Sequence, residues 1–390
     1  MEKKILLAVD DSIHSMDAVR YAVNMSLPVK DVTYTLCHVQ PGISGFLLDQ
    51  ARTDFQAQAE LKKITRKNAE KAHGMLQKYK EWIVGMGIAE KRIDLVTAPR
   101  ALGLTKDILL CAERGLYDAI VAGRRGLSRI QKTFMGSTSA TLLSHSMVVP
   151  VWIVDGKVAS TRIMVAVDGS ENSLRAVDHL SFMLAGNPEI KVTLFHVVPK
   201  FRDYQAFNIK EEESVLHQII ARHERQYIQD FFAHARQRLN DAGIKNGQIE
   251  VKVTRPSLHL GKRIIDEARK GNYGTVVIGR RGVSKAFFLG SASKYVIDRI
   301  SGICDRQDFR PGHMARFMKQ HAGFCPQDNS TTSGSLPELR KMGTLLTKTS
   351  PIYPKSSVTH PPFVILIQLS QQRPLTNHKS RLPRRGNCGD

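Results

Sequence analysis

The chain contains the same unit twice, and this repetition constrains its fold more than any other feature of the sequence. Four pairs of similar segments occur in the same order, 154 to 158 residues apart. The pairs are KILLAVDDS at Lys4–Ser12 with RIMVAVDGS at Arg162–Ser170, TYTLCHV at Thr33–Val39 with KVTLFHV at Lys191–Val197, IVAGRRG at Ile120–Gly126 with VVIGRRG at Val276–Gly282, and GSTS at Gly136–Ser139 with GSAS at Gly290–Ser293. We therefore expect two domains of one fold, at residues 1–155 and 160–301, followed by a segment at 302–390.

Short apolar runs alternate with longer polar stretches in both units, which is the pattern of a parallel α/β sheet. The first unit has expected strands at Ile5–Val9, Thr33–Val39, Ile93–Thr97, Tyr117–Ala122 and Val148–Val154, and expected helices after Ser12 and at Thr53–Val84, Thr105–Arg114 and Ser137–His145. The second has strands at Ile163–Val167, Val192–Val198, Ile249–Thr254 and Thr275–Ile278, and helices at Ser170–Leu184, Glu211–Asn240, Leu260–Arg269 and Ser291–Ile300. Ligands of such sheets bind at the edge formed by the carboxyl ends of the strands.

The second unit has no fifth strand in place, because a polar segment broken by Pro311 follows its last helix. Pro, Ser, Thr and basic residues dominate beyond this point, so we expect 302–390 to be mostly disordered. Phe363–Leu369 is the one strand-like segment there. It could supply the missing edge strand over a long linker, but an aggregation-prone apolar tail is the simpler interpretation.

The net charge of +21 favours anionic partners. The C-terminal part of the chain is strongly basic, since residues 301–390 contain 13 basic and 5 acidic residues. Charge alone does not separate a nucleotide or nucleic acid partner from a general solubility effect. The start of the chain does not resemble a secretory signal, and the longest apolar run near either end is Phe363–Leu369, so we expect a cytoplasmic protein without a membrane partner. Five cysteines without a CxxC pair support neither a disulfide framework nor a zinc site.

A glycine-rich loop after the fourth strand is the main candidate for a binding site. It contains Gly123, Arg124 and Gly126, and after nine further residues Gly136 and Ser137 open a helix. Backbone N–H groups and a helix N-terminus in this setting can hold a phosphate. Hydroxyl and basic side chains near the loop could also bind the phosphate oxygens, namely those of Ser137, Ser139, Arg124, Arg125, Arg129 and Lys132. The alternative is a flexible β–α connection whose glycines serve turns and whose arginines face solvent.

Asp10 and Asp168 each follow the first strand of a unit, two residues before a serine. A carboxylate at this place can accept hydrogen bonds from a ribose hydroxyl or an adenine amino group. It can also cap the next helix. The residues alone favour neither role.

Hydrolytic and redox motifs do not occur in the sequence. There is no P-loop, no G-x-S-x-G elbow and no H-E-x-x-H zinc helix. His38 and His196 occupy matching positions in apolar strands, where hydrogen-bonded core histidines are more common than catalytic bases.

These segments resemble the universal stress protein family. The strand-end V-D-x-S occurs at Val9–Ser12 and Val167–Ser170, and the loop G-x2-G-x9-G-[ST] is complete in the first unit. The resemblance implies two tandem Rossmann-like domains of the adenine nucleotide alpha hydrolase type, each an open parallel sheet of order 3-2-1-4-5. It also implies that the protein binds ATP, commonly together with Mg²⁺. The residues of this chain that would coordinate the Mg²⁺ ion are not identifiable. The ATP-binding residues that it implies are Asp10 and Val39 for adenosine, and Gly123, Gly126, Gly136, Ser137 and Ser139 for ribose and phosphates.

The second unit departs from this pattern. Gly279, Gly282, Gly290 and Ser291 remain, but seven residues separate the inner glycines instead of nine, so nucleotide binding through these residues and Asp168 is less well supported. Family members often dimerise through the last strand, and two units in one chain could form that pair internally. A homo-oligomer is the alternative.

The sequence thus predicts a stress-response protein that binds ATP in its first domain and regulates a partner, whose identity the sequence does not give. A second hypothesis is slow ATP hydrolysis or autophosphorylation, with Ser137 or a nearby hydroxyl as the acceptor. A third is a nucleotide-independent module whose basic tail binds nucleic acid, which we do not expect.

Overall fold

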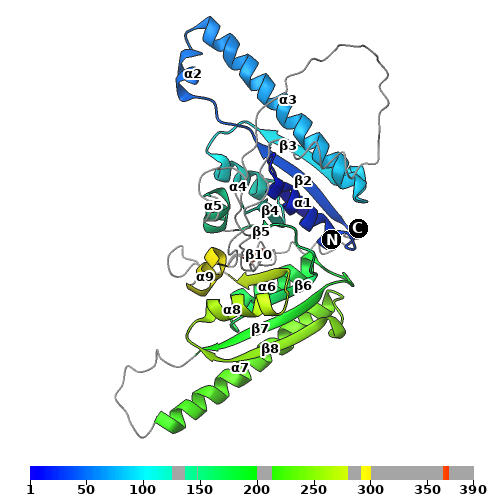
Figure 1. Cartoon of the computed structure of the whole chain (residues 1–390), viewed down its shortest axis with the longest axis vertical. Helices are drawn as coiled ribbons and strands as arrows, with labels where there is room; N and C mark the ends of the chain where they lie inside the picture. The colour runs from blue at the N-terminus through cyan, green and yellow to red at the C-terminus, as the bar shows by residue number, and fades with distance from the viewer. Residues whose placement is uncertain (125–136, 147, 200–212, 280–290, 300–362, 369–390) are drawn as a thin grey trace, which may run out of the picture. The chain divides into compact units, whose positions relative to one another are not determined.

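The computed structural model describes residues 1–124, 137–146, 148–199, 213–279, 291–299 and 363–368 (Figure 1). All of these residues belong to one compact unit of the chain. Strands and helices alternate along both repeats, as the sequence predicts.

The first repeat contains every predicted strand and helix. Its elements are β1 (Lys3–Ala8), α1 (Ile13–Ser26), β2 (Val32–Val39), α2 (Gly45–Gln50), α3 (Phe55–Gly85), the 3₁₀ turn Glu90–Arg92, β3 (Ile93–Ala98), α4 (Leu104–Arg114), β4 (Ala119–Gly123), α5 (Ser137–His145) and β5 (Val151–Asp155). The short helix α2 was not predicted. It has six residues and none of them is buried, so no apolar periodicity marks it in the sequence.

The second repeat follows the same order and has four strands within its own continuous sequence, as predicted. Its elements are β6 (Arg162–Val167), α6 (Glu171–Met183), β7 (Lys191–Pro199), α7 (Glu213–Asp241), the 3₁₀ turn Asn246–Gln248, β8 (Ile249–Ser257), α8 (Leu260–Lys270), β9 (Thr275–Gly279) and α9 (Ser291–Arg299).

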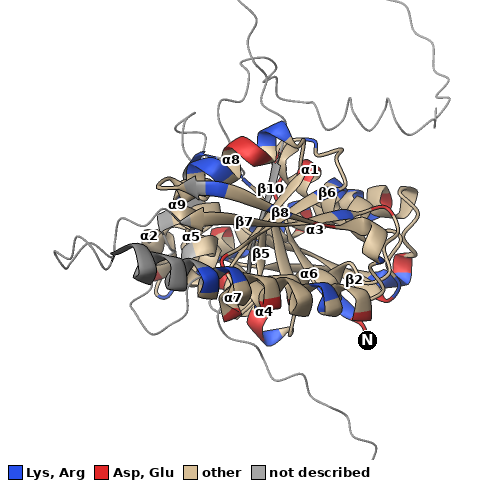
Figure 2. Cartoon of the chain, turned by 90° about the horizontal axis from the view of Figure 1, so that it is seen from below, with Lys and Arg blue, Asp and Glu red and all other residues tan. Residues whose placement is uncertain are grey.

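The strands of the first repeat form a parallel sheet in the order β3-β2-β1-β4-β5, which confirms the expected order. β1 shows why the strands read as continuous apolar runs. Ile5, Leu6 and Leu7 are at most 1% exposed, because helices cover both faces of the sheet (Figure 2). Order reverses between β1 and β4, which is the switch point where open sheets of this kind bind ligands.

The C-terminal segment supplies the fifth strand of the second repeat, and this strand joins the strands of both repeats into one ten-stranded sheet. β10 (Phe363–Gln368) pairs in parallel with β9 and antiparallel with β5. Ile365 stands opposite Val276 on one side and Ile153 on the other. The interpretation of this segment as an aggregation-prone tail is therefore wrong, and the edge-strand alternative is confirmed. The physical reason is that β5 and β9 would otherwise each expose an unpaired edge. The rest of the predicted disordered tail lies outside the described residues.

Contacts between the repeats involve side chains of α1 and β5 on one side and of the second repeat on the other. The Tyr21 hydroxyl lies 2.8 Å from that of Thr275, and the Asn187 amide donates to the Met25 carbonyl at 2.8 Å. The Trp152 indole donates to Nε2 of His179 at 3.2 Å. Burial lowers the pKa of His179 to about 3, so this ring stays neutral and can accept that bond.

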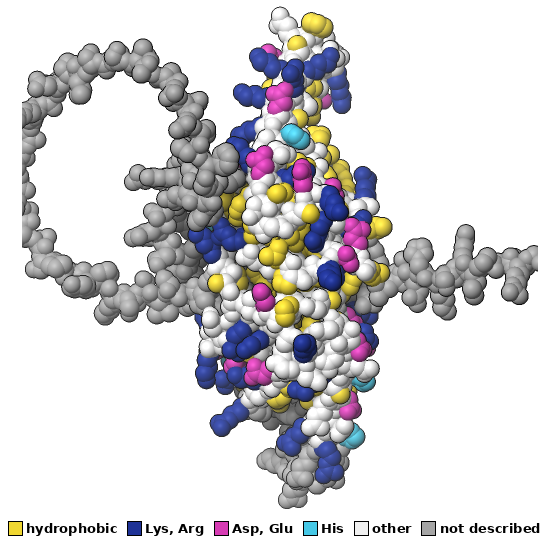
Figure 3. Space-filling model, turned by 90° about the vertical axis from the view of Figure 1, so that its right-hand side faces the viewer, with side chains coloured by type: hydrophobic (Ala, Val, Ile, Leu, Met, Phe, Trp, Pro, Cys, Tyr) yellow, Lys and Arg dark blue, Asp and Glu magenta, His cyan; other side chains and the backbone are white. Residues whose placement is uncertain are grey.

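Basic side chains are spread over the face shown in Figure 3, with acidic ones among them. None of the helices in the described part of the chain has both the length and the apolar composition that crossing a membrane requires.

Candidate functional site

A pocket lies where the carboxyl ends of β1, β2 and β4 meet α4 and the first turn of α5. The pocket is small and partly open to solvent. The described residues that line it are Ala8, Val9, Asp10, Ser15, Cys37, His38, Val39, Leu104, Ile108, Ala122, Gly123, Thr138, Ser139 and Leu142. The predicted site residues Asp10, Val39, Gly123 and Ser139 are thus brought together from four elements or their ends.

Asp10 is a buried carboxylate in this pocket, 7% exposed. Its Oδ1 accepts hydrogen bonds from the Ser15 hydroxyl at 2.6 Å and from the Ser12 backbone N–H at 3.2 Å. Oδ2 has no hydrogen-bond partner among the described residues and is left to accept from a ligand. Burial raises the pKa of Asp10, and the hydrogen bonds from Ser12 and Ser15 oppose this effect.

The roles of helix cap and of carboxylate acceptor are divided between two residues. The Ser12 hydroxyl caps α1 by accepting from the backbone N–H of Ser15 at 3.2 Å. The Asp10 side chain binds the same turn but does not cap the helix alone. The start of α1 is therefore held by the Ser12 hydroxyl together with Asp10.

Gly123 ends β4 directly beside the start of α1. A side-chain carbon placed on Gly123 would lie 2.6 Å from the backbone carbon and oxygen of His14, so only glycine fits here. Gly279 has the same constraint against the Asn172 carbonyl, at 2.8 Å. The first glycine of the loop therefore has a packing role in both repeats, whatever it binds.

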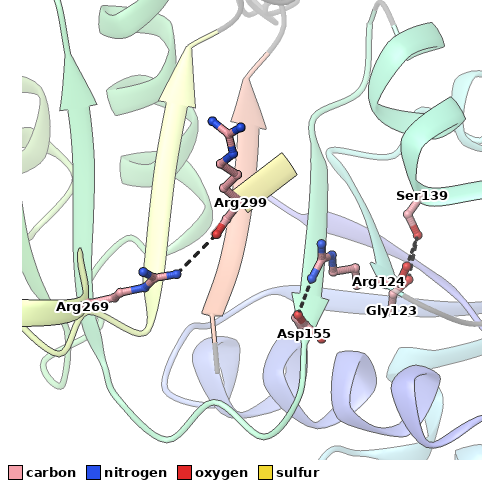
Figure 4. Close-up of polar contacts among 6 residues, drawn as sticks. All are labelled: Gly123, Arg124, Ser139, Asp155, Arg269 and Arg299. Atoms are coloured by element: carbon pink, nitrogen blue, oxygen red, sulfur yellow. Dashed lines mark hydrogen bonds and ion pairs between the residues drawn. The ribbon is translucent and has the colours of Figure 1, made fainter. Parts of the chain in front are cut away.

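Ser139 and Arg124 connect the end of β4 to its neighbours (Figure 4). The Ser139 hydroxyl donates to the Gly123 carbonyl at 2.9 Å and to the Arg124 carbonyl at 3.1 Å. Arg124 is buried, with 1% of the residue exposed. Its guanidinium donates to the Asp155 carboxylate on β5 at 2.8 Å. Its charge is thus already paired with a carboxylate, and Arg124 is not among the residues that line the pocket.

The remainder of the predicted loop lies outside the described residues. This applies to Gly126, Gly136, Arg125, Arg129 and Lys132, and in the second repeat to Gly282 and Gly290. Ser137 and Ser291 begin α5 and α9, but their side chains are also outside the described part.

His38 and His196 are held by the main chain. Nδ1 of His38 lies 2.8 Å from the Val9 carbonyl oxygen, and Nδ1 of His196 lies 2.9 Å from that of Val167. Each ring links the first two strands of its repeat, which confirms that these histidines are hydrogen-bonded. Both are half-buried rather than core residues, and His38 lines the pocket.

The second repeat has larger side chains at two positions that correspond to lining residues of the pocket. By the repeat alignment, Phe195 stands for Cys37 and Ile278 for Ala122, and both are at most 4% exposed. Asp168 differs from Asp10 as well, because it is exposed and accepts from Ser170 through both the backbone N–H and the hydroxyl. Partial desolvation raises the pKa of Asp168, but these bonds and that of Ser173 outweigh it, so the pKa is lowered overall.

Sequence reasoning missed several wall residues, notably Ser15, Cys37, Ile108 and Ala122. Comparing the repeats position by position would have indicated two of them, since Cys37 and Ala122 are the small members of their pairs. Among the described residues, no cluster of three or more His, Cys, Asp or Glu side chains could hold a metal ion.

The chain is similar to several solved structures. A crystal structure of a universal stress protein from Archaeoglobus fulgidus DSM 4304 is 20% identical, with a TM-score of 0.50, and the match covers 76% of this chain and 94% of that one. A functionally unknown protein from Pseudomonas aeruginosa PAO1 is 16% identical, with a TM-score of 0.46, over 76% of this chain and 89% of that one. A universal stress protein in complex with cAMP is 21% identical, with a TM-score of 0.25, over 35% of this chain and 88% of that one.

No curated protein sequence matches the chain. The model of the universal stress protein family matches it twice, at residues 1–155 and 160–301. These two matches cover more than half of the sequence and coincide with the two copies of the fold. The chain therefore belongs to the universal stress protein family and carries two family domains in tandem.

Proposed function

We propose that this protein is a cytoplasmic stress-response protein whose first repeat binds ATP, and that binding changes its conformation or its association with a partner protein. The observation that carries the proposal is the buried Asp10 carboxylate in a pocket at the switch point of the sheet, with one oxygen free to accept. A ribose hydroxyl or an adenine amino group is a donor of the required kind.

The apolar side chains in the pocket wall support contact with the faces of an adenine ring. Val39, Ile108, Ala122 and Leu142 line it, and Asp10, Ser15, His38, Thr138 and Ser139 supply polar groups. Apolar walls with placed polar groups are typical of small-molecule sites. The phosphates would extend toward the N-terminal turn of α5, where backbone N–H groups are available.

The glycine residues Gly126 and Gly136 and the hydroxyl of Ser137 complete the phosphate site in this proposal. Ser139 supports it indirectly, because its hydroxyl fixes the first turn of α5 to the end of β4. Mg²⁺ would accompany the phosphates and neutralise part of their charge, and we assign it no ligand in the chain.

A binding role is supported over rapid turnover by the chemistry of the lining. Its titratable side chains among the described residues are Asp10, Cys37 and His38, and the Nδ1 atom of His38 already bonds a main-chain carbonyl. One nucleotide per chain is expected, because Phe195 and Ile278 are larger than Cys37 and Ala122, to which they correspond.

Calorimetric titration of the purified full chain with ATP and Mg²⁺ tests the proposal. We choose Val39→Trp to fill the pocket, since a valine at Gly123 would collide with His14 and disturb the fold. Val197→Trp is the matched control, because Val197 is the equivalent position of the second repeat and is equally buried, at 8% exposure. Both substitutions overpack a core and should cost a similar 1–3 kcal/mol, roughly, of unfolding free energy.

The wild type should bind about one ATP per chain. Val39→Trp should weaken binding at least about tenfold, since the indole takes the space of the base, and Val197→Trp should leave affinity within about twofold. Absence of saturable binding by the wild type, or equal affinity in both variants, would contradict the proposal.

A further inference from the structure

Two thiols of the first repeat meet beside the pocket, and the proposed function uses neither. Cys37 belongs to β2 and lines the pocket, whereas Cys111 belongs to α4. Their sulfur atoms are 3.9 Å apart, although the residues are 74 positions apart in the sequence. Both are free, with Cys37 buried and Cys111 partly exposed.

The pair is polarised, because the two thiols share one hydrogen bond. The S–H of Cys37 donates to the sulfur of Cys111. This bond lowers the pKa of Cys111, against the opposing effect of burial, and it raises the pKa of Cys37 together with burial. Cys111 is therefore the more readily ionised thiol, and the thiolate is the nucleophilic form of cysteine.

We propose that Cys37 and Cys111 form an oxidisable dithiol, which a small hydroperoxide converts into an intramolecular disulfide. The Cys111 thiolate attacks one oxygen of hydrogen peroxide and the O–O bond breaks. Cys111 becomes a sulfenic acid, and the departing hydroxide takes the proton that Cys111 lost and leaves as water. The Cys37 sulfur then attacks the sulfenic sulfur, the S–O bond breaks, and hydroxide leaves with the Cys37 proton as a second water. The two thiols together lose two electrons and two protons, and the peroxide is reduced.

The geometry requires a small displacement. The sulfur atoms must approach from 3.9 Å to the about 2.05 Å of a disulfide bond. The peroxide can reach Cys111 because that residue is partly exposed, whereas Cys37 is buried in the wall of the pocket. The bond would fasten α4 to β2, and both elements line the pocket through Ile108 and Val39.

This property is confined to the first repeat. At the equivalent positions the second repeat has Phe195 and Glu267, and Glu267 forms an ion pair with Lys252 at 2.6 Å. The inference does not rest on nucleotide binding, because the two thiols and their distance suffice for the reaction.

The experiment uses the full chain with Cys304, Cys325 and Cys388 replaced by serine, so that only the two thiols remain. The folded, reduced protein is treated with hydrogen peroxide, quenched, digested and analysed by mass spectrometry. We expect a loss of two hydrogens from the intact mass, a linked peptide pair containing Cys37 and Cys111, and recovery of the thiols with dithiothreitol. Linking should be at least about tenfold faster in the folded chain than in urea, because folding holds the thiols together.

Single substitutions assign the order of events. In Cys37→Ser the sulfenic acid should persist on Cys111 and be trapped by dimedone, whereas Cys111→Ser should give little adduct. In the chain that keeps both Cys37 and Cys111, amide hydrogen exchange in α4 should be slower after oxidation than in the reduced form. The slower exchange would report the new covalent link between α4 and β2. Circular dichroism establishes that both single variants are folded.

Three results would overturn the inference. They are the absence of a Cys37–Cys111 peptide pair after peroxide has consumed the thiols, equal linking rates in the folded and unfolded chain, and dimedone trapping on Cys37 in preference to Cys111.

Discussion

At the scale of single residues, the two strand-end aspartates show how one sequence motif acquires two electrostatic environments. Asp10 is buried beside a pocket, and burial raises its pKa. Asp168 is exposed, and the hydrogen bonds from Ser170 lower its pKa overall. Buried carboxylates with an elevated pKa are frequent at functional sites. An exposed carboxylate that accepts hydrogen bonds from its own turn, as Asp168 does, stabilises local structure.

Asp10→Asn should weaken ATP binding by about 10- to 100-fold, because it removes one charge-assisted hydrogen bond to the ligand. The variant should nevertheless be at least as stable as the wild type at pH 7. The ionised carboxylate is unfavourable in the folded state, so its stabilising contribution is present below the unfolded pKa of 3.8 and is lost as pH rises through the raised folded value. Urea unfolding from pH 4 to pH 7 should show the stability difference between variant and wild type growing in favour of the variant.

Asp168→Asn is the control with the opposite sign. Its lowered pKa means that the Asp168 carboxylate stabilises the fold above pH 3.8, and that this contribution is lost as pH falls through the folded value. This variant should be less stable than the wild type at pH 7 and should bind ATP normally. Loss of binding in Asp168→Asn with normal binding in Asp10→Asn would reverse our assignment.

The sequence predicts where the site residues lie, but not all of their contacts. The sequence correctly places Asp10, Val39 and Ser139 at the edge formed by the carboxyl ends of the strands, because strand ends and helix starts are local features. It does not show that the Arg124 guanidinium binds Asp155, since that contact depends on how β4 and β5 lie together. The meeting of Cys37 with Cys111 is hidden for the same reason.

At the scale of elements, β10 shows where local reasoning ends. The apolar run Phe363–Leu369 is visible in the sequence, but its position between β5 and β9 is set by pairing with strands far away in the chain. The strands and helices of the two repeats were predictable because each repeat confirms the pattern of the other. The segment that fills the edge has no second copy to compare.

Ile365→Pro should destabilise the fold by at least about 2 kcal/mol, because proline removes a backbone donor from a strand that is paired on both sides. Urea unfolding measures the loss, and amide hydrogen exchange in β5 and β9 should become faster. Ile365→Val is the matched control, since it keeps the backbone N–H and the β-branched shape. Unchanged stability and unchanged exchange in the proline variant would show that β10 does not pair in solution.

At the scale of the whole molecule, duplication has produced two copies of one fold with unequal sites. The first repeat combines a pocket, a buried carboxylate and a pair of thiols, while Phe195, Ile278 and Glu267 replace the corresponding small residues and thiol in the second. The second copy contributes contacts to the first through Thr275, His179 and Asn187. Under the proposed function, the first repeat binds the nucleotide and the second repeat supports it through these contacts.

The most direct test of this account is a crystal structure of the full chain soaked with Mg²⁺ and a non-hydrolysable ATP analogue. We predict nucleotide density at the carboxyl ends of β1, β2 and β4 in the first repeat, with the adenosine against Asp10 and Val39 and the phosphates at the start of α5. The second repeat should hold none. A first-repeat pocket that stays empty at saturating nucleotide, or density confined to the second repeat, would contradict the account.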